Sequence, residues 1–393
     1  MNPISWFFRG FIAALITVGI VLIKTPIWFW DIATRPRPTK EYPNGLQIYF
    51  TYLARTFLRQ CAIYKAQPNP STRQPSKLRD RLLCRHFTWI EPAPLSSREH
   101  EEKRTTAATG FDDSPLPVAL DVAESKKKTA ALWYLNPKEP GDIPTKEQRR
   151  QSRVVLYFHG GAYITLEAGD MFMGLTLARM QAKYVEVDVL SVNYRLAPGS
   201  KYPSQLYEAF SAWRHLREMG YESIFLGGDS AGGNLALTLW RYLDQVANDS
   251  QAVEGIILHS PWVDWNGLTR ASLNERSPHC AVTYTFGIEG VKSMQNNGLP
   301  KMTDGWASPI YWTDNILSRL PPMFVNTAGI EALREENEMF VAAAKSAGAK
   351  VTHIITEGMP HDFTAQWWFA GAVRRLFLQT HTWIDGVKMV GEA

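Results

Sequence analysis

The spacing of hydrophobic residues divides the chain into a uniformly apolar start and a long region of alternating short runs. Residues 11–23 contain no charge, and clusters of Trp and Phe flank them on both sides. A helix from about Ile4 to Trp28 is long enough to span a bilayer when Arg9 and Lys24 extend toward the head groups. The pattern therefore predicts a membrane-spanning helix within residues 1–30.

Two other interpretations of this apolar start compete with a membrane span. A cleaved signal peptide ends in small residues, whereas Lys24-Thr25-Pro26 leads into a Trp-rich segment. The other alternative is a buried helix of a soluble protein, but this run is apolar all round and leaves little polar face for water. We therefore predict an uncleaved signal-anchor helix.

From residue 154 onward, short continuous apolar runs alternate with helical stretches such as Tyr207–Glu218 and Asn234–Val246. Such runs are typical of strands that are buried on both faces of a parallel sheet. The alternation predicts an α/β fold with a mostly parallel sheet and helices on both faces, whose ligands bind beyond the carboxyl ends of the strands. The predicted strands are Val154–Phe158, Val187–Val192, Ser223–Leu226, Gly255–His259, Met323–Asn326 and Val351–Ile355.

The other segments complete the predicted organisation. Residues 31–129 are expected to form a linker and a cap-forming N-terminal segment, in which residues 46–64 have the spacing of an amphipathic helix. That helix is expected to cover an active site, to rest on a membrane or to pack against the main domain. Residues 130–393 are expected to form the main domain, with a cap insert over 265–320. The aromatic residues of the insert either line an apolar pocket or pack in the core.

Composition narrows the class of protein. The 393 residues are 45% hydrophobic and 20% charged, which fits a globular protein. The formal net charge of +4 comes from scattered residues, so nucleic acid is not an expected partner. Cys61, Cys84 and Cys280 lack metal-like or CxxC spacing. We expect them to be buried free thiols, with one disulfide as the alternative.

A glycine-rich turn carries the strongest chemical motif. Gly228-Asp229-Ser230-Ala231-Gly232-Gly233 follows a predicted strand and opens a predicted helix, the context that the GxSxG motif requires. A nucleophilic serine must stand on a sharp turn with its Oγ exposed, and side chains two positions away would collide there. The N-terminus of the next helix favours negative charge. We therefore predict that Ser230 is a nucleophile.

A second glycine-rich turn, His159-Gly160-Gly161-Ala162, directly follows the first predicted strand. A turn of this kind aims several backbone N–H groups at one point. The negatively charged oxygen of an acyl-transfer intermediate needs such donors. An ordinary strand-end turn is the alternative, but its pairing with GxSxG favours the chemical interpretation.

A serine hydroxyl is a weak nucleophile and needs an adjacent base. In this fold the acid and then the base follow the nucleophile along the chain. His361 lies just after the last predicted strand and is the expected base. Four other histidines have structural explanations, since they lie in a strand, before Ser-Pro, in a late helix and in the insert: His353, His259, His381 and His279.

The acid is expected after the predicted strand Met323–Asn326. Glu331 occupies that place, and Asp264, at the end of the preceding strand, is the alternative. An acid there would hold the imidazole tautomer and stabilise the imidazolium. The expected triad is therefore Ser230, His361 and Glu331.

These motifs together resemble the hormone-sensitive lipase-like family of α/β-hydrolases over residues of about 130–393. The matching pieces are His159-Gly160-Gly161, Tyr194-Arg195-Leu196-Ala197-Pro198, Gly228-Asp229-Ser230-Ala231-Gly232-Gly233, Ser260-Pro261-Trp262-Val263-Asp264 and Met359-Pro360-His361-Asp362-Phe363. The resemblance implies a carboxylesterase, lipase or deacetylase without a cofactor. It also implies oxyanion donors in the Gly160-Gly161-Ala162 turn and at Ala231.

The chain departs from the family pattern at two positions. Ala162 stands where the family has a third glycine, which preserves the N–H provided that the local φ accommodates a Cβ. Glu331, in Glu-Ala-Leu, stands where the family has the Asp of a DPL segment. With its apolar start, the chain also resembles the membrane-bound arylacetamide deacetylases and fungal steryl acetyl hydrolases, which deacetylate lipophilic molecules in the endoplasmic reticulum.

The sequence therefore predicts a membrane-anchored serine esterase for a lipophilic ester, with a short acyl group such as acetyl. An amidase or formamidase on the same triad and a catalytically inactive ligand-binding protein are the alternatives. The orientation in the membrane is open, because Lys24, Arg35, Arg37 and Lys40 after the span predict a cytosolic domain by the positive-inside rule. The membrane-bound relatives imply a lumenal one, with which the sequon at Asn248 is compatible.

Overall fold

The computed structural model describes residues 3–34, 43–64, 85–93, 127–138, 146–267 and 279–387. Within these ranges, eight strands form one sheet in the order β1-β2-β4-β3-β5-β6-β7-β8. β2 pairs antiparallel with both of its neighbours, and all the other pairings are parallel. The strands are β1 (Arg85–Ile90), β2 (Thr129–Tyr134), β3 (Arg153–Phe158), β4 (Asp188–Asn193), β5 (Ser223–Asp229), β6 (Val253–His259), β7 (Met323–Ala328) and β8 (Val351–Thr356). The predicted mostly parallel sheet is confirmed.

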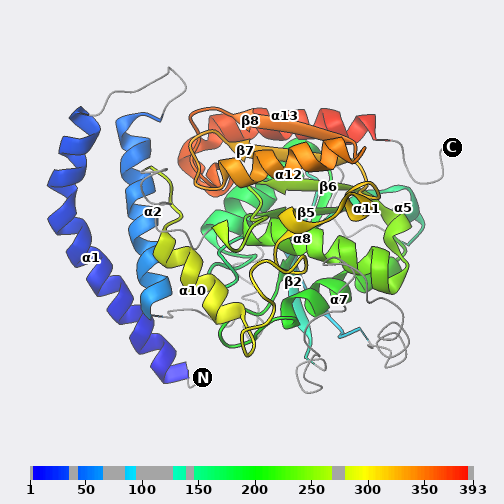
Figure 1. Ribbon diagram of the computed structural model, residues 1–393, viewed down its shortest axis with the longest axis horizontal. Helices are drawn as coiled ribbons and strands as arrows, with labels where there is room; N and C mark the ends of the chain where they lie inside the picture. Colours follow the sequence, from blue (N-terminus) through cyan, green and yellow to red (C-terminus); the bar gives the residue numbers. More distant parts are fainter. Residues whose placement is uncertain are drawn as a thin grey trace.

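Helices connect and cover these strands (Figure 1). The α-helices are α1 (Pro3–Thr34), α2 (Gly45–Tyr64), α5 (Lys146–Gln151), α6 (Arg179–Val185), α7 (Ser204–Met219), α8 (Ala231–Tyr242), α10 (Tyr284–Met294), α11 (Asp314–Leu317), α12 (Arg334–Ser346) and α13 (Ala370–Gly386). Shorter 3₁₀ and π-helical turns are η4 (Met171–Ala178), η5 (Leu243–Ala247), η6 (Ser250–Ala252), η8 (Pro309–Tyr311), η9 (Phe363–Ala365) and η10 (Trp367–Phe369).

The sheet is buried on both faces, which explains the continuous apolar runs. Successive side chains of a strand point to opposite faces, and β3 shows the result: Val154 and Leu156 belong to one core, whereas Val155 and Tyr157 belong to the other. Helices α7, α8 and α12 contribute to the first core, and α6 and α13 contribute to the second. The sheet and the helices on its two faces together place the carboxyl ends of β5, β7 and β8 at one edge of the sheet.

Two strands were not predicted. β1 and β2 form the antiparallel end of the sheet, and β1 lies within residues 31–129, which were expected to form a linker and cap. β2 is buried along its whole length, and β1 is a six-residue edge strand. A short edge strand such as β1 has neither a long apolar run nor a clean alternation, so the hydrophobic pattern does not reveal it. β2 does contain an apolar run, over residues 130–134, which the sequence analysis did not include among its strands.

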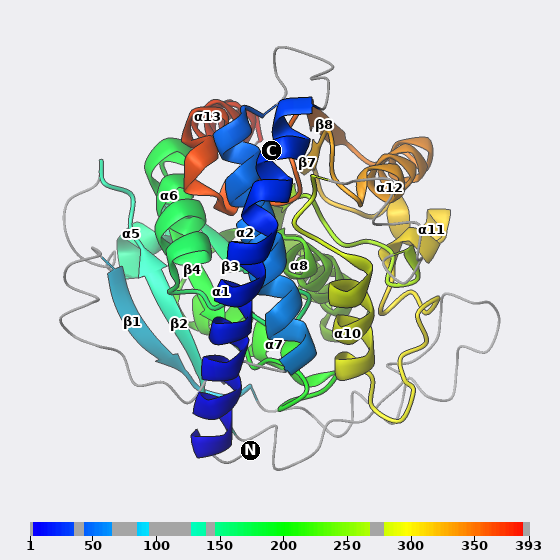
Figure 2. The ribbon, with the colours of Figure 1, turned by 90° about the vertical axis from the view of Figure 1, so that its left-hand side faces the viewer.

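Helix α1 contains the predicted membrane-span candidate. Phe11–Thr34 is a stretch of 24 residues that is long enough to cross a membrane, and its most apolar 18-residue window has a mean hydropathy of 2.0. The helix extends past Trp28 and includes Pro26. Its C-terminal half packs antiparallel against α2 through aromatic rings, with Trp28 5.5 Å from Tyr52 and Phe29 5.4 Å from Tyr49 between ring centroids. Figures 1 and 2 show the two helices side by side along one flank of the molecule.

Helix α2 joins α1 to the main domain. Asn44 caps it by accepting the N–H of Gln47 at 3.0 Å, while the Gln47 side chain accepts the N–H of Asn44 at 2.9 Å. Phe50 lies 5.4 Å from the ring of Trp367, and Gln47 Nε2 donates to the carbonyl of Trp368. Of the three alternatives for this helix, the structure therefore shows two at once: the helix packs against the main domain, and its residues Ala54, Phe57 and Leu58 line a cavity beside Ser230.

The structure describes two of the three cysteines. Cys61 in α2 and Cys280 are buried free thiols, and burial raises the pKa of Cys61 to about 12. Cys84 and the loop 96–112 lie outside the described residues, as do residues 268–278 of the cap insert.

Candidate active site

Ser230 stands on the sharp turn between β5 and α8. Its φ of 50° and ψ of −117° are strained for a residue with a Cβ, which costs on the order of 1–3 kcal/mol. A Cβ on Gly228 would lie 2.3 Å from the backbone of Gly232, and one on Gly232 would lie 1.9 Å from the carbonyl oxygen of Phe158. Both flanking glycines are therefore required, because the turn presses the chain against β3 and against itself.

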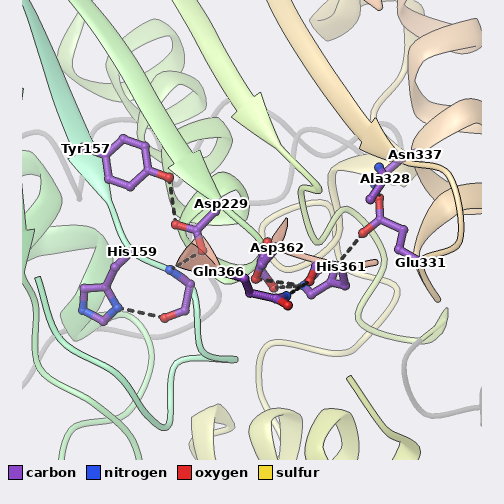
Figure 3. Close-up of polar contacts among 11 residues, drawn as sticks. Tyr157, His159, Asp229, Ala328, Glu331, Asn337, His361, Asp362 and Gln366 are labelled. Atoms are coloured by element: carbon purple, nitrogen blue, oxygen red, sulfur yellow. Dashed lines mark hydrogen bonds and ion pairs between the residues drawn. The ribbon is translucent and has the colours of Figure 1, made fainter. Parts of the chain in front are cut away.

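Three side chains that the sequence analysis selected meet at this turn. His361 Nε2 lies 2.9 Å from Ser230 Oγ, and its Nδ1 lies 2.5 Å from Glu331 Oε2. Ser230, Glu331 and His361 are all buried, at 5%, 4% and 2% exposure, so bulk water does not compete for these contacts. Figure 3 shows the imidazole directed at the Glu331 carboxylate. The order serine, imidazole, carboxylate is the arrangement that activates a hydroxyl.

The loop after β7 holds the Glu331 carboxylate. Its Oε1 accepts the backbone N–H of Ala328 at 2.9 Å and lies 3.4 Å from Asn337 Nδ2, which leaves Oε2 for the imidazole. Gln366 Nε2 donates to the His361 carbonyl at 2.8 Å and steadies the loop after β8. The sequence analysis did not identify Asn337 or Gln366, because neither has a motif of its own.

A second carboxylate flanks the imidazole. Asp362 Oδ2 lies 3.1 Å from His361 Nε2, the nitrogen that also faces Ser230. Burial alone would lower the pKa of His361, but the carboxylates of Asp362 and Glu331 outweigh it and raise this pKa well above its usual value. Asp362 has a left-handed backbone with a φ of 51°, which Asp and Asn tolerate better than most residues. The sequence signal that could have identified Asp362 is its position next to His361.

Asp229, which precedes the serine, binds the second glycine-rich turn. The Tyr157 hydroxyl donates to its Oδ1 at 2.8 Å, and the N–H of Gly160 donates to its Oδ2 at 3.0 Å (Figure 3). Burial and the nearby Asp362 raise the pKa of Asp229 well above its usual value. Because Asp229 uses the N–H of Gly160, the expectation that Gly160 donates to an oxyanion is corrected.

The other three N–H groups that were expected to donate to an oxyanion remain candidates for that role. The hydrogen bonds found in the described ranges include none donated by the N–H groups of Gly161, Ala162 or Ala231. Gly161 has a φ of 105°, and a Cβ there would lie 2.2 Å from the carbonyl oxygen of Thr165. Ala162 adopts a φ of 52°, so this departure from the family glycine places a Cβ in the left-handed region.

The residues that were alternatives to Glu331 and His361 contact other groups. Asp264 Oδ1 accepts the N–H of Asn266 at 2.9 Å, whereas Glu331 contacts His361. The side chains of five other histidines in the described ranges have partners other than Ser230. His159 Nδ1 lies 2.8 Å from the Gly160 carbonyl, His259 packs on Phe377, His279 Nδ1 lies 3.0 Å from the Tyr52 hydroxyl, His353 Nε2 lies 2.9 Å from Thr327 Oγ1, and His381 Nδ1 lies 3.0 Å from the Val185 carbonyl. Burial lowers the pKa of His159 to about 4 and that of His259 to about 3.

A small apolar cavity of about 70 Å³ opens beside Ser230 and His361. Part of its wall comes from α2, and the insert contributes another part, including Phe286 of α10. The three tryptophans of the insert, Trp265, Trp306 and Trp312, pack in the core, whereas Tyr311 is exposed. The lining residues are Ala54, Phe57, Leu58, Gly161, Leu166, Phe172, Met173, Ser230, Ala281, Val282, Phe286, His361, Asp362, Ala365 and Gln366. Within the described ranges, no group of three or more His, Cys, Asp or Glu side chains is placed to hold a metal.

Known proteins are similar to this chain in sequence and in fold. The chain is 29% identical to the carboxylic ester hydrolase LipN of Mycobacterium tuberculosis over 58% of this chain and 62% of LipN. It is 28% identical to the versiconal hemiacetal acetate esterase of Aspergillus parasiticus, over 58% of this chain and 72% of that enzyme. Among solved structures it resembles a hormone-sensitive lipase from a metagenome library, with 26% identity, a TM-score of 0.54, and coverage of 66% of this chain and 82% of that one.

Fold similarity reaches further along the chain. The carboxylesterase EstE1 from a metagenomic library superposes with a TM-score of 0.58 at 22% identity, and the match covers 87% of this chain and 98% of EstE1. Residues 155–365 match the family described by the alpha/beta hydrolase fold. These residues contain Ser230, Glu331, His361 and both glycine-rich turns. The chain therefore belongs to the α/β-hydrolase family.

Proposed function

We propose that this protein is a serine carboxylesterase in which Ser230 is the nucleophile, His361 the general base and Glu331 the acid of the triad. The observation that carries the proposal is the continuous contact from Ser230 through His361 to Glu331 at the mouth of an apolar cavity. The relatives named as ester hydrolases support the same reaction class.

The geometry supports acyl transfer in two halves. His361 Nε2 takes the proton of Ser230 as Oγ attacks the ester carbonyl, and it then delivers that proton to the leaving alcohol. In the second half, water attacks the acyl-enzyme while His361 takes its proton. The proton then returns to Ser230 Oγ as the carboxylic acid product leaves. Glu331 holds the Nδ1 proton and stabilises the imidazolium in both halves, and its own position is set by Ala328 and Asn337.

Backbone donors stabilise the charge that forms on the carbonyl oxygen. The N–H groups of Gly161, Ala162 and Ala231 fill this role in the proposal. Removing one such donor costs about 10²- to 10³-fold in rate in well-studied enzymes. Asp229 supports them indirectly, because its contact with Gly160 ties the first turn to the nucleophile turn.

The proposed substrate is a lipophilic ester with a short acyl group. The cavity is small and its wall is mainly apolar, which suits an acetyl or other short acyl chain. Relatives named as an acetyl-hydrolase from Streptomyces hygroscopicus and as a hemiacetal acetate esterase support a short acyl group. We further propose that α1 anchors the enzyme in a membrane, that of the endoplasmic reticulum, as the resemblance to membrane-bound deacetylases implies.

Covalent labelling tests the nucleophile. A fluorophosphonate probe should label the full chain at Ser230, because such probes react with an activated serine, and Ser230→Ala should abolish labelling. Ser260→Ala, which changes a buried serine in the neighbouring turn, is the matched control and should still label. Equal labelling of the Ser230→Ala variant would refute the assignment.

A substrate panel tests the reaction class. Matched acetyl, butyryl and octanoyl esters, together with the corresponding amides, should show the highest kcat/KM for short-chain esters. Faster cleavage of amides would make the enzyme an amidase on the same triad. Labelling without turnover of any member would contradict the proposed esterase activity.

A further inference from the structure

A second cavity lies between α1 and α2, apart from the cavity beside Ser230. Its volume is about 510 Å³, much larger than that of the catalytic cavity. Its wall combines side chains of α1, α2 and the start of α10. The lining residues are Ile20, Lys24, Ile27, Trp28, Asp31, Tyr52, Arg55, Thr56, Arg59, Gln60, Thr283 and Thr285.

Positive charge predominates in this wall. Lys24 comes from α1, and Arg55 and Arg59 come from α2, against the single carboxylate of Asp31. Arg55 and Arg59 lie one helical turn apart and are therefore neighbours on the same face. Burial lowers the pKa of Arg55, and the charge of Arg59 lowers it further. Lys24 and Arg59 are exposed, so a ligand can reach both from solvent.

The carboxylate of Asp31 contacts a hydroxyl group in the cavity wall. The Tyr52 hydroxyl donates to Asp31 Oδ2 at 2.6 Å and lies 3.0 Å from Nδ1 of His279. The remaining polar lining consists of the hydroxyls of Thr56, Thr283 and Thr285 and the amide of Gln60. Cationic side chains combined with hydroxyl and amide groups are the donors that proteins use to bind phosphate.

We propose that this cavity is a binding site for a net-negative phosphate group, with Lys24 and Arg59 as its accessible cations. The group comes either from an anionic phospholipid headgroup or from a soluble phosphate ester. The outer surface of α1 favours the phospholipid, because the apolar side chains of Leu22, Ile23 and Trp30 are exposed on the same helix that lines the cavity and provide a surface for acyl chains. Cations at a membrane surface attract anionic lipids in the same way.

Lipid binding by the full chain in a neutral detergent tests the site, with no dependence on the proposed esterase reaction. Native mass spectrometry would count the molecules retained from phosphatidylglycerol, from phosphatidylcholine and from glycerol 3-phosphate. The test variant is the double substitution Lys24→Gln and Arg59→Gln. The control is Lys301→Gln and Lys350→Gln, which removes the same charge from two exposed lysines that do not line the cavity.

We expect the wild-type chain to retain phosphatidylglycerol and the test variant to bind it about tenfold more weakly, at an unchanged melting temperature, while the control binds normally. Asp31→Asn should bind it more tightly, because it removes the negative charge; a merely loosened helix pair would not give that result. Equal binding of glycerol 3-phosphate, with the same dependence on the variants, would support the site with a soluble ligand. Equal retention of phosphatidylcholine, equal binding by test and control variants, or weaker binding by Asp31→Asn would overturn the proposal.

Discussion

At the residue scale, the imidazole of His361 is the centre of the site, because three oxygen-bearing side chains surround it. Glu331 contacts Nδ1, whereas Ser230 and Asp362 both contact Nε2. A carboxylate beside Nε2 stabilises the imidazolium and competes with the serine hydroxyl for that nitrogen. Both carboxylates raise the pKa of His361, but only Glu331 contacts Nδ1 and is placed to set the tautomer.

Replacing Glu331 tests the assignment of the acid. In Glu331→Gln the amide NH₂ group faces Nδ1, so the ring is forced into the tautomer that cannot accept the serine proton. We expect kcat to fall by about 10³- to 10⁴-fold with the fold retained, as for a triad acid elsewhere. Asp264→Asn is the control and should remain close to wild type in steady-state kinetics. The opposite pair of results would transfer the role to Asp264.

Replacing Asp362 tests the electrostatic effect. Its negative charge raises the pKa of His361, so Asp362→Asn should lower that pKa. The neutral, active base then persists to lower pH. The acid limb of the profile of kcat/KM against pH should therefore shift toward lower pH. Asn also tolerates the left-handed backbone at this position, so the fold should be retained.

The exposed Asp314→Asn is the matched control for this pH profile. It removes one carboxylate from a position that does not line the cavity, and the acid limb should not move. An acid limb that stays in place, or shifts to higher pH, in Asp362→Asn would show that this carboxylate does not set the charge of His361.

At the scale of elements, α2 connects the membrane-span candidate with the catalytic cavity. One part of it packs against Trp28 and Phe29 of α1, and another part places Ala54 and Leu58 in the cavity wall. A helix in this position limits the space for the acyl chain. It therefore contributes to selectivity, although it lies outside the residues 155–365 that match the family.

Enlarging a side chain on α2 tests this limit. Ala54→Phe should fill the cavity and lower kcat/KM for an octanoyl ester by at least about tenfold relative to an acetyl ester, since each lost methylene contact is worth roughly 1–3 kcal/mol. Leu46→Phe, on an exposed part of the same helix, should leave the ratio unchanged. Equal losses for both esters would mean that α2 does not set acyl length.

At the scale of the whole molecule, α1 and α2 lie along one flank of the sheet domain (Figure 2), and residues of α2 line the catalytic cavity. Trp367 and Met171, both exposed, are apolar residues of the main domain, and Trp367 packs on Phe50 of α2. A lipophilic substrate held at a membrane would meet the enzyme on this flank.

Membrane extraction tests the anchor. The full chain should remain with membranes after alkaline carbonate treatment, because the 24-residue stretch Phe11–Thr34, with an 18-residue window of mean hydropathy 2.0, prefers the bilayer to water. A chain lacking residues 1–38 should be released yet still react with a fluorophosphonate, although it exposes Tyr49 and Tyr52 of α2 and should melt at a lower temperature. Release of the full chain by carbonate would contradict the anchor.

Protease protection in sealed microsomes decides the orientation. Survival of the main domain without detergent, and digestion with detergent, would indicate a lumenal domain. Digestion without detergent would indicate the cytosolic domain that the positive-inside rule predicts.

Several parts of this protein could be predicted from the local pattern of residues along the chain. The six parallel strands, the apolar α1 and the turn around Ser230 were predicted because a buried strand, a bilayer span and a crowded turn each restrict nearby residues. The α/β class with a mostly parallel sheet followed from the same alternation of strands and helices, whereas the α/β-hydrolase fold was implied by the resemblance of the motifs to that family. His361 was selectable because the base of this fold follows its last strand.

Tertiary structure decided everything that depends on residues far apart in the chain. It placed β1 at the sheet edge, put α2 in the cavity wall, occupied the N–H of Gly160 with Asp229, and set Asp362 against His361. Spacing along the chain does not determine which side chain a hydrogen-bond donor meets across the fold, because that depends on how the layers pack. The cationic cavity between α1 and α2 has the same origin, since its charges come from two helices whose contact no local pattern reveals.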